Sequence, residues 1–292
     1  MFLAFLAFCM FTNVEIGKVE VPTVLMFMEY LSQNGLSPSS IRSYMAGIIV
    51  YFKWFNLRHE VFYHFKVTLM YRALQRSIHR AAKFKGVFTV THLQEIIKCC
   101  GSLPNPHFYR TAYLFAYFGF LRISNLVPSS RNTFSIKKHL CRGDVLINND
   151  SLVVLIKWSK TLQASNQGSY IILPKFNESH ISPRHHFVHM SKMFPVCKNQ
   201  PCFSYRCSFL VESMLREHLR KIVASMGLDP SNHTFHTFRR SGTTLAHNLD
   251  IPIKNIKRHG TWMSDAVQSY IIDDPQRASA VSTSFVRFFN QH

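Results

Sequence analysis

Arginine, lysine, histidine and tyrosine residues in the middle and C-terminal parts of the chain have types and settings that could do chemistry. Arg122 follows a glycine turn after an apolar segment, and Lys160 follows a run of β-branched residues. His236 and Arg239 are three residues apart, so they share one face of a helix. Tyr270 comes last in this order, eight residues after a tryptophan. Each fragment is common by chance when it is taken singly.

Together, these residue types fit phosphodiester transfer without a metal ion. The non-bridging phosphate oxygens gain negative charge in the transition state, and the planar guanidinium of arginine can bind them through two hydrogen bonds. A lysine or a histidine can donate the proton that the leaving oxygen needs. A tyrosine hydroxyl, with an ordinary pKa of about 10, loses its proton far more easily than a serine hydroxyl. The set therefore predicts a tyrosine nucleophile with arginines around the phosphate.

The charge of the chain predicts a polyanionic partner. Lys and Arg number 34 against 15 Asp and Glu, which gives a formal net charge of +19, while 47% of the residues are hydrophobic and can form a sizeable core. The positive charge is spread over the chain without a polybasic block beside an amphipathic segment, so a membrane-targeting patch is not indicated. We expect a nucleic acid as the partner and no membrane.

No metal and no cofactor are predicted. The sequence has neither a P-loop nor clustered carboxylates that could hold Mg²⁺. The seven cysteines include no CxxC pair, which favours free thiols in a reducing compartment. Cys197, Cys202 and Cys207 lie near several histidines, so a zinc site is an alternative, but their spacing does not match the usual ligand pattern.

The first part of the chain, residues 1–85, predicts a small helical bundle. Helices are expected over 22–33, 40–53 and 66–82, and Ser37 or Ser39 can cap the second of them. The apolar opening segment reads as a buried first helix, with an N-terminal truncation of the domain as an open alternative. Along the third helix, arginines recur every four residues on one face and are candidates for phosphate contact: Arg72, Arg76 and Arg80.

The second part, residues 86–292, predicts a mixed domain that is mainly helical. Two β-branched runs, 152–158 and 169–175, flank a polar Ser-Asn-Gln-Gly loop and indicate a β-hairpin. Helices are expected before and after this hairpin, over 92–100, 107–118, 208–226, 236–248, 252–259 and 264–272. A last amphipathic segment, 276–289, carries several phenylalanines. The fold class is therefore mainly α with a small β-hairpin, arranged as two domains.

The ordered set resembles the tyrosine recombinase family of phage-type integrases and Xer and Cre recombinases. The matching stretches are GFLRISNL at 119–126, SKT at 159–161, FHTFRRSG at 235–242 and RHGTWMSD at 258–265, followed by Tyr270. The wording HTFRRSGTTLA and RHGTWMSDAVQSYI is most similar to recombinases of eukaryotic DIRS-like and Ngaro-like retrotransposons. The resemblance covers nearly the whole chain. It implies a core-binding domain over 20–82 and a catalytic domain over about 88–290.

The resemblance implies a role for each residue around the phosphate. Arg122 and Arg239 would bind the scissile phosphate of double-stranded DNA, and Lys160 would protonate the leaving 5′ oxygen. Arg240 is a further candidate for DNA contact. Because the covalent adduct of such enzymes keeps the energy of the broken bond, rejoining would need neither ATP nor a metal.

The remaining residues would act at the nucleophile. His236 would assist proton transfer, Trp262 would pack on the phosphate or donate a hydrogen bond to it, and Tyr270 would form the 3′-phosphotyrosine. The stretch from Trp262 to Tyr270 is one residue shorter than in many bacterial relatives, so His259 is an alternative to Trp262. Lys157 is a weaker alternative to Lys160, because it is expected within the strand.

The resemblance also implies an assembly and a biological setting. In relatives the C-terminal helix docks onto a neighbouring subunit, so segment 276–289 is expected to support a homodimer or a homotetramer on DNA. Packing of this segment onto its own domain is the alternative. The expected function is recombination or integration of a mobile element, in the nucleus if the source is eukaryotic. An inactive DNA-binding descendant and a relaxing topoisomerase are the rival readings.

Overall fold

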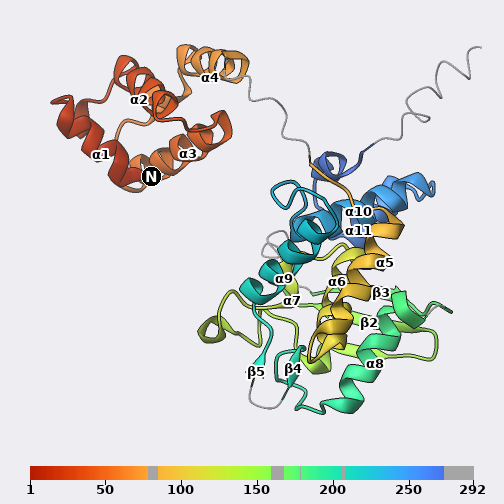
Figure 1. Ribbon diagram of the computed structural model, residues 1–292. Coiled ribbons are helices and arrows are strands. Elements are labelled where there is room, and N and C mark those ends of the chain that lie inside the picture. Colours follow the sequence, from red (N-terminus) through yellow and green to blue (C-terminus); the bar gives the residue numbers. More distant parts are fainter. Residues whose placement is uncertain (78–84, 159–167, 178, 206–207, 273–292) are drawn as a thin grey trace, which may run out of the picture. The chain divides into compact units, whose positions relative to one another are not determined.

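The computed structural model describes residues 1–77, 85–158, 168–177, 179–205 and 208–272 (Figure 1). The chain divides into two compact units, Met1–Lys83 and Phe84–His292. Each unit has a hydrophobic core of its own.

The first unit is a helical bundle around an aromatic core. Its helices are α1 (Phe2–Phe11), α2 (Val21–Gln33), α3 (Pro38–Trp54) and α4 (Phe65–Ser77), with 3-10 turns at Ile16–Lys18 and Glu60–Tyr63. The cap of α3 is Ser37, whose Oγ accepts a hydrogen bond from the backbone N–H of Ser40 at 3.2 Å, and Pro38 fits the first turn because its missing N–H needs no partner there. Helix α4 confirms the predicted helix 66–82 as far as Ser77, and the rest of the predicted helix lies outside the described residues.

Helix α1 buries one side of the apolar opening segment. Phe5 is fully buried and its ring contacts the rings of Phe27 and Phe52, whereas Leu3 and Met10 are exposed. Packing of aromatic rings in this way accounts for much of the core of a small bundle. In the described part of the chain, no helix is both long enough and apolar enough to span a bilayer.

The second unit is mainly helical. Its helices are α5 (Val90–Cys99), α6 (Pro106–Phe118), α7 (Ile123–Leu126), α8 (Pro183–Met193), α9 (Glu212–Ser225), α10 (Phe235–Asn248) and α11 (Ile253–His259). Helix α6 lies in the core, where residues 111–117 are all buried. It packs against both α8 and α10. A helix that is apolar on all sides is expected in such a central position.

A three-stranded antiparallel sheet lies beside α8 (Figure 1). Its strands are β1 (Val145–Ile147), β2 (Ser151–Ile156) and β3 (Ser169–Pro174), in the order β1-β2-β3. Leu152, Val154 and Ile156 alternate with less buried residues, so one face of β2 joins the core. A short second ladder pairs β4 (Ser204–Tyr205) with β5 (Ser208–Phe209).

The predicted fold class, mainly α with a small antiparallel sheet, is confirmed, but several element boundaries were wrong. The expected strand 152–158 ends at Ile156, and the expected helix 208–226 begins only at Glu212, because Ser208 and Phe209 pair with β4. The expected helix 264–272 is a 3-10 segment, Asp265–Tyr270, in which Val267 is the buried residue.

Several elements were not predicted from the sequence, among them the one-turn helix α7, the β4–β5 ladder, strand β1 and helix α8. Strand β1 is only three residues long, and two of them are exposed, so it has no alternating pattern to detect. Helix α8 contains several histidines that hide its apolar spacing, although Phe187 and Met190 face the core.

Candidate active site

A strained corner between α6 and α7 positions Arg122. Helix α6 ends at Gly119, and Phe120 adopts a left-handed conformation with φ of 50°, which costs about 1–3 kcal/mol for a residue with a side chain. Arg122 then begins α7, where its backbone N–H donates a hydrogen bond to Oδ1 of Asn125 at 3.1 Å. The Arg122 side chain is half-buried, and its Nη1 is buried without a hydrogen-bond partner in the described part of the chain.

Helix α10 carries His236 and Arg239 to the same place. The helix approaches α6 closely at Gly242, where any side chain would collide with the carbonyl oxygen of Tyr117. Arg239 is only 1% exposed. Its Nη1 donates to the carbonyl of Phe120, and its Nη2 donates to the carbonyl of Gly260 at 2.8 Å. These two bonds fix the plane of the guanidinium, and among the described residues its Nε remains without a partner.

The Gly260-Thr261-Trp262 turn places an indole ring beside this arginine. The ring centroid of Trp262 lies 3.7 Å from the guanidinium carbon of Arg239, the arrangement of a cation–π contact. Only glycine fits at position 260, because a Cβ there would overlap the Trp262 ring. Trp262 is 6% exposed, and its Nε1 is buried with no acceptor in the described regions.

Tyr270 ends the 3-10 segment with its ring over the same pocket. The ring centroids of His236 and Trp262 lie 5.0 Å and 5.1 Å from that of Tyr270, and the Arg239 guanidinium lies 5.4 Å from it. The tyrosine therefore reaches the arginine of its own chain, although the spacing from Trp262 is short. Lys160 lies outside the described residues. The structure brings together the other five predicted site residues: Arg122, His236, Arg239, Trp262 and Tyr270.

The pocket is strongly electropositive. Burial, followed by the nearby Arg122, lowers the pKa of Arg239 to about 9, so its guanidinium stays charged at neutral pH. His236 is exposed to solvent as a residue, but partial burial of its ring and the charges of Arg239 and Arg240 lower its pKa to about 4. The imidazole is therefore neutral at pH 7 and can accept a proton.

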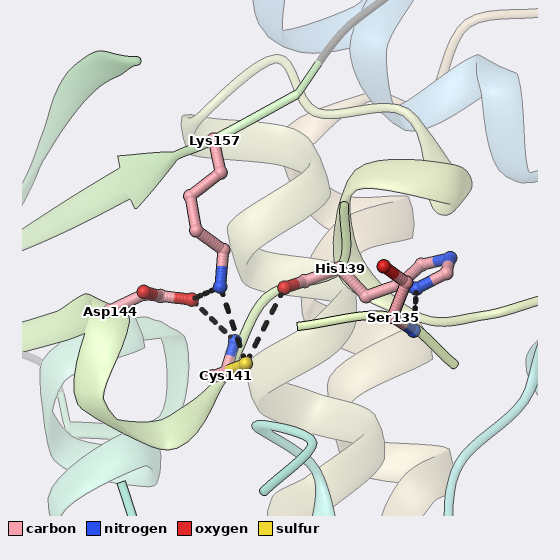
Figure 2. A network of polar contacts seen from close by, with 5 residues as sticks. All are labelled: Ser135, His139, Cys141, Asp144 and Lys157. Atoms are coloured by element: carbon pink, nitrogen blue, oxygen red, sulfur yellow. Dashed lines mark hydrogen bonds and ion pairs between the residues drawn. The ribbon is translucent and has the colours of Figure 1, made fainter. Parts of the chain in front are cut away.

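Lys157, the alternative to Lys160, is already paired (Figure 2). It follows the last residue of β2, and its Nζ lies 2.5 Å from Oδ2 of Asp144 and 3.3 Å from Sγ of Cys141. The same Asp144 oxygen accepts the backbone N–H of Cys141 at 2.6 Å. The side chains of Lys157 and Asp144 are 19% and 14% exposed, so this is a largely buried ion pair.

His259, the alternative to Trp262, is hydrogen-bonded to the backbone at the end of α6. Its Nε2 lies 2.8 Å from the carbonyl oxygen of Phe118, and its ring packs edge-on against Phe120. Burial lowers the pKa of His259, so the neutral ring donates through Nε2 to this carbonyl. The contact ties α11 to the end of α6.

The predicted DNA-contacting arginines are in different environments. Arg72 and Arg76 are exposed on α4, and Arg80 lies outside the described residues. Arg240 is 7% exposed and donates from Nη1 to the carbonyl of Gly86 at 3.1 Å, while its Nε is buried without a partner in the described chain. The predicted subunit contact at 276–289 also lies outside the described residues.

Metal-ligating side chains do not gather into a site among the described residues, where no group of three could hold an ion. Of the cysteines weighed for zinc, Cys202 is buried and Cys197 is exposed, while Cys207 lies outside the described residues.

Two polar residues that support the pocket were missed by the sequence reading. Asn125 accepts the N–H of Arg122 and donates to the carbonyl of Trp158 at 2.8 Å, which links the arginine to the end of the β2 segment. Thr244 donates to the carbonyl of Tyr270. No sequence signal distinguishes them, because the carbonyl groups to which they donate, those of Trp158 and Tyr270, are distant in the chain.

Comparisons with known proteins give structural matches alone. No protein-family model matches the chain, and no curated protein matches it by sequence. A post-cleavage complex of the XerH site-specific recombinase with DNA superposes with a TM-score of 0.63 at 16% identity, over 92% of this chain and 73% of that one.

Two further matches have similar coverage. The Tn1549 transposon integrase in complex with transposon right-end DNA has a TM-score of 0.62 at 12% identity, over 94% of this chain and 87% of that one. A lambda integrase dimer bound to a core site has a TM-score of 0.53 at 15% identity, over 93% and 71%. The chain therefore has the mainly helical fold, with a small antiparallel sheet, of the tyrosine recombinases.

Proposed function

We propose that this chain is a site-specific DNA recombinase or integrase that cleaves and rejoins DNA through a 3′-phosphotyrosine on Tyr270. The observation that carries the proposal is a set of buried donors around this tyrosine. Nη1 of Arg122, Nε of Arg239 and Nε1 of Trp262 are buried without acceptors in the described part of the chain. Unsatisfied buried donors are costly, and a phosphate group would supply acceptors for all three.

The chemistry follows from these positions. The Tyr270 oxygen attacks the phosphorus, a bond forms between them, and the bond from phosphorus to the 5′ oxygen breaks. His236, neutral at pH 7, receives the tyrosine proton directly or through water. Arg122 and Arg239 stabilise the charge that develops on the non-bridging oxygens.

The proton for the leaving 5′ oxygen comes from Lys160. Support for this choice is indirect: Lys157 is engaged with Asp144, and withdrawing it would leave a carboxylate buried without its cation. Trp262 is preferred to His259 for the remaining position, because the His259 Nε2 is engaged with the carbonyl of Phe118.

The partner of the proposed enzyme is double-stranded DNA. The net charge of +19 supports it, and so do the structural matches to XerH, Tn1549 integrase and lambda integrase, each of which was solved with DNA. Exposed Arg72 and Arg76 would contact phosphates from the first unit, and segment 276–289 would join subunits. We further infer a mobile-element role and, in a eukaryote, a nuclear location, from the resemblance of the HTFRRSGTTLA and RHGTWMSDAVQSYI stretches alone.

Covalent capture on nicked duplexes tests the proposal. The protein is incubated with a randomised duplex library carrying single nicks, because loss of the short cleaved strand traps the adduct. Wild-type protein is expected to yield DNA that stays attached under denaturing conditions, and the attached strands are sequenced to read the target site.

Tyr270→Phe is the matched control. It removes one hydroxyl and keeps the ring contacts with Trp262 and His236, so it is expected to bind DNA normally and to form no adduct. An adduct in the Tyr270→Phe variant would disprove the nucleophile assignment. DNA binding without any adduct in the wild-type protein would instead identify an inactive DNA-binding descendant.

A further inference from the structure

The hydroxyl of Thr244 contacts the backbone on both sides of Ile271. Its Oγ1 donates a hydrogen bond to the carbonyl of Tyr270 at 3.1 Å and accepts one from the N–H of Ile272 at 3.3 Å. Thr244 is 9% exposed, so these bonds are largely shielded from water. One side chain of α10 therefore holds the backbone at the end of the tyrosine segment.

We propose that Thr244 is a positioning residue for the nucleophile, which fixes the Tyr270 backbone to the helix that carries Arg239. The inference rests on the proposed function for its catalytic consequence. The hydrogen bonds of Thr244 to the Tyr270 segment are independent of the proposed function. Thr244 touches no reacting atom and acts through Tyr270.

Other contacts hold the segment at its beginning, whereas Thr244 holds its backbone at the end, beside the ring contacts of Tyr270 itself. Lys257 pairs with Asp265 at 2.9 Å, and Val267 is fully buried beside Trp262 and Ile256. These contacts precede Tyr270 by several residues in a short 3-10 segment. Rotation of the segment about Val267 would therefore still move the tyrosine ring.

The position of Tyr270 matters because in-line attack requires the nucleophile at about 3–3.5 Å from phosphorus, and a misplacement of about 1 Å can cost a hundredfold in rate. Arg239 is fixed by its bonds to the carbonyls of Phe120 and Gly260. Thr244 joins the tyrosine to the same rigid helix. The nucleophile and the phosphate-binding group are then both held in place by α10.

The neighbouring Thr243 provides a matched control. It is fully buried on the same helix, and its Oγ1 donates to the Arg239 carbonyl at 2.7 Å, within the helix itself. Thr243→Val and Thr244→Val each replace a hydroxyl with a methyl group at a buried site. Only the second removes a bond to the Tyr270 segment.

The first measurement is hydrogen exchange of the Ile272 amide, followed by NMR in protein labelled with ¹⁵N-isoleucine. Thr244→Val is expected to speed this exchange by about tenfold, the effect of losing one hydrogen bond, while Thr244→Ser restores protection. Thr243→Val should leave it unchanged. Unchanged exchange in Thr244→Val would overturn the proposal, whether or not the protein cleaves DNA.

The second measurement is the single-turnover rate of adduct formation beside the affinity for the same DNA. Thr244→Val is expected to slow adduct formation by about ten- to a hundredfold with DNA affinity unchanged, and Thr244→Ser to recover most of the rate. Equal rates in Thr244→Val and wild type would also overturn the proposal. If the wild-type protein formed no adduct but the exchange rates changed as expected, the proposed function would be disproved. The role of Thr244 in holding the backbone of this segment would still be supported.

Discussion

Arg239 and Lys157 are both shielded from water in the second unit, but only Lys157 has a carboxylate as its partner among the described residues. Lys157 lies 2.5 Å from a carboxylate and beside a thiol (Figure 2). Arg239 is bound to two backbone carbonyls and an indole face, with Arg122 as its charged neighbour. Its positive charge has no carboxylate partner among the described residues.

The difference separates a structural cation from one that is held for a ligand. Burying a charge is costly unless it is paired, so the Lys157–Asp144 pair is internally balanced and needs nothing further. The Arg239 site lacks an anion, because the guanidinium groups of Arg122 and Arg239 lie close together, and a phosphate diester would supply one negative charge between them. Binding of an anionic partner at this site is therefore expected to stabilise the folded protein.

Replacing the pocket arginine should give the largest effect. Arg239→Lys keeps the charge but loses the planar pair of donors, so adduct formation is expected to fall by about a hundred- to a thousandfold, because contacts to developing charge strengthen in the transition state. The dissociation constant for DNA, measured by fluorescence anisotropy, should change by only a few-fold. Parallel losses of both quantities would show that Arg239 contributes to binding alone.

Replacing the paired lysine should instead lower stability. Lys157→Met leaves Asp144 buried without its cation, and the free energy of unfolding is expected to fall by about 3 kcal/mol, as measured by urea denaturation. The double variant Lys157→Met/Asp144→Asn, which removes both charges and keeps an acceptor for the Cys141 N–H, should recover most of it. If folded Lys157→Met protein formed no adduct, Lys157 rather than Lys160 would be the proton donor and the comparison would fail.

Two histidines at the α6–α8 contact, the half-buried His107 and the buried His186, should give a smaller, pH-dependent effect on stability. Nδ1 of His107 lies 3.0 Å from Nδ1 of His186, whose Nε2 lies 2.8 Å from the carbonyl of His180. Burial is the main cause that lowers the pKa of both His107 and His186 from 6.5 to about 4. These rings are neutral when folded, so the unfolded chain takes up more protons between these pH values.

Stability from these histidines is therefore complete above about pH 6.5 and falls as the pH drops toward 4. Thermal unfolding across pH 7.5 to 4.5 should show a falling melting temperature, and the variant His107→Asn/His186→Asn should show a shallower fall. A wild-type profile no steeper than that of the variant would contradict the neutral pairing.

The sequence predicted a set of site residues, five of which the structure brings together, whereas it misplaced several of the elements that carry them. The fold class and the hairpin were predicted correctly, because β-branched runs and apolar helices leave a strong local pattern. Helix α8 and strand β1 were missed, since histidines mask the spacing of the first and the second is too short. The tyrosine segment was taken for an α-helix, but it forms a 3-10 segment in which Val267 is the buried residue.

The sequence by itself determined which residue types were available for phosphoryl transfer and in what order they follow along the chain, because these are properties of composition and motif. Only the tertiary structure decided that Lys157 is paired, that His259 braces a carbonyl, and that Thr244 holds the tyrosine segment. Each of these contacts joins side chains to groups far away in the chain. Their energies depend on burial and distance, which no local spacing encodes.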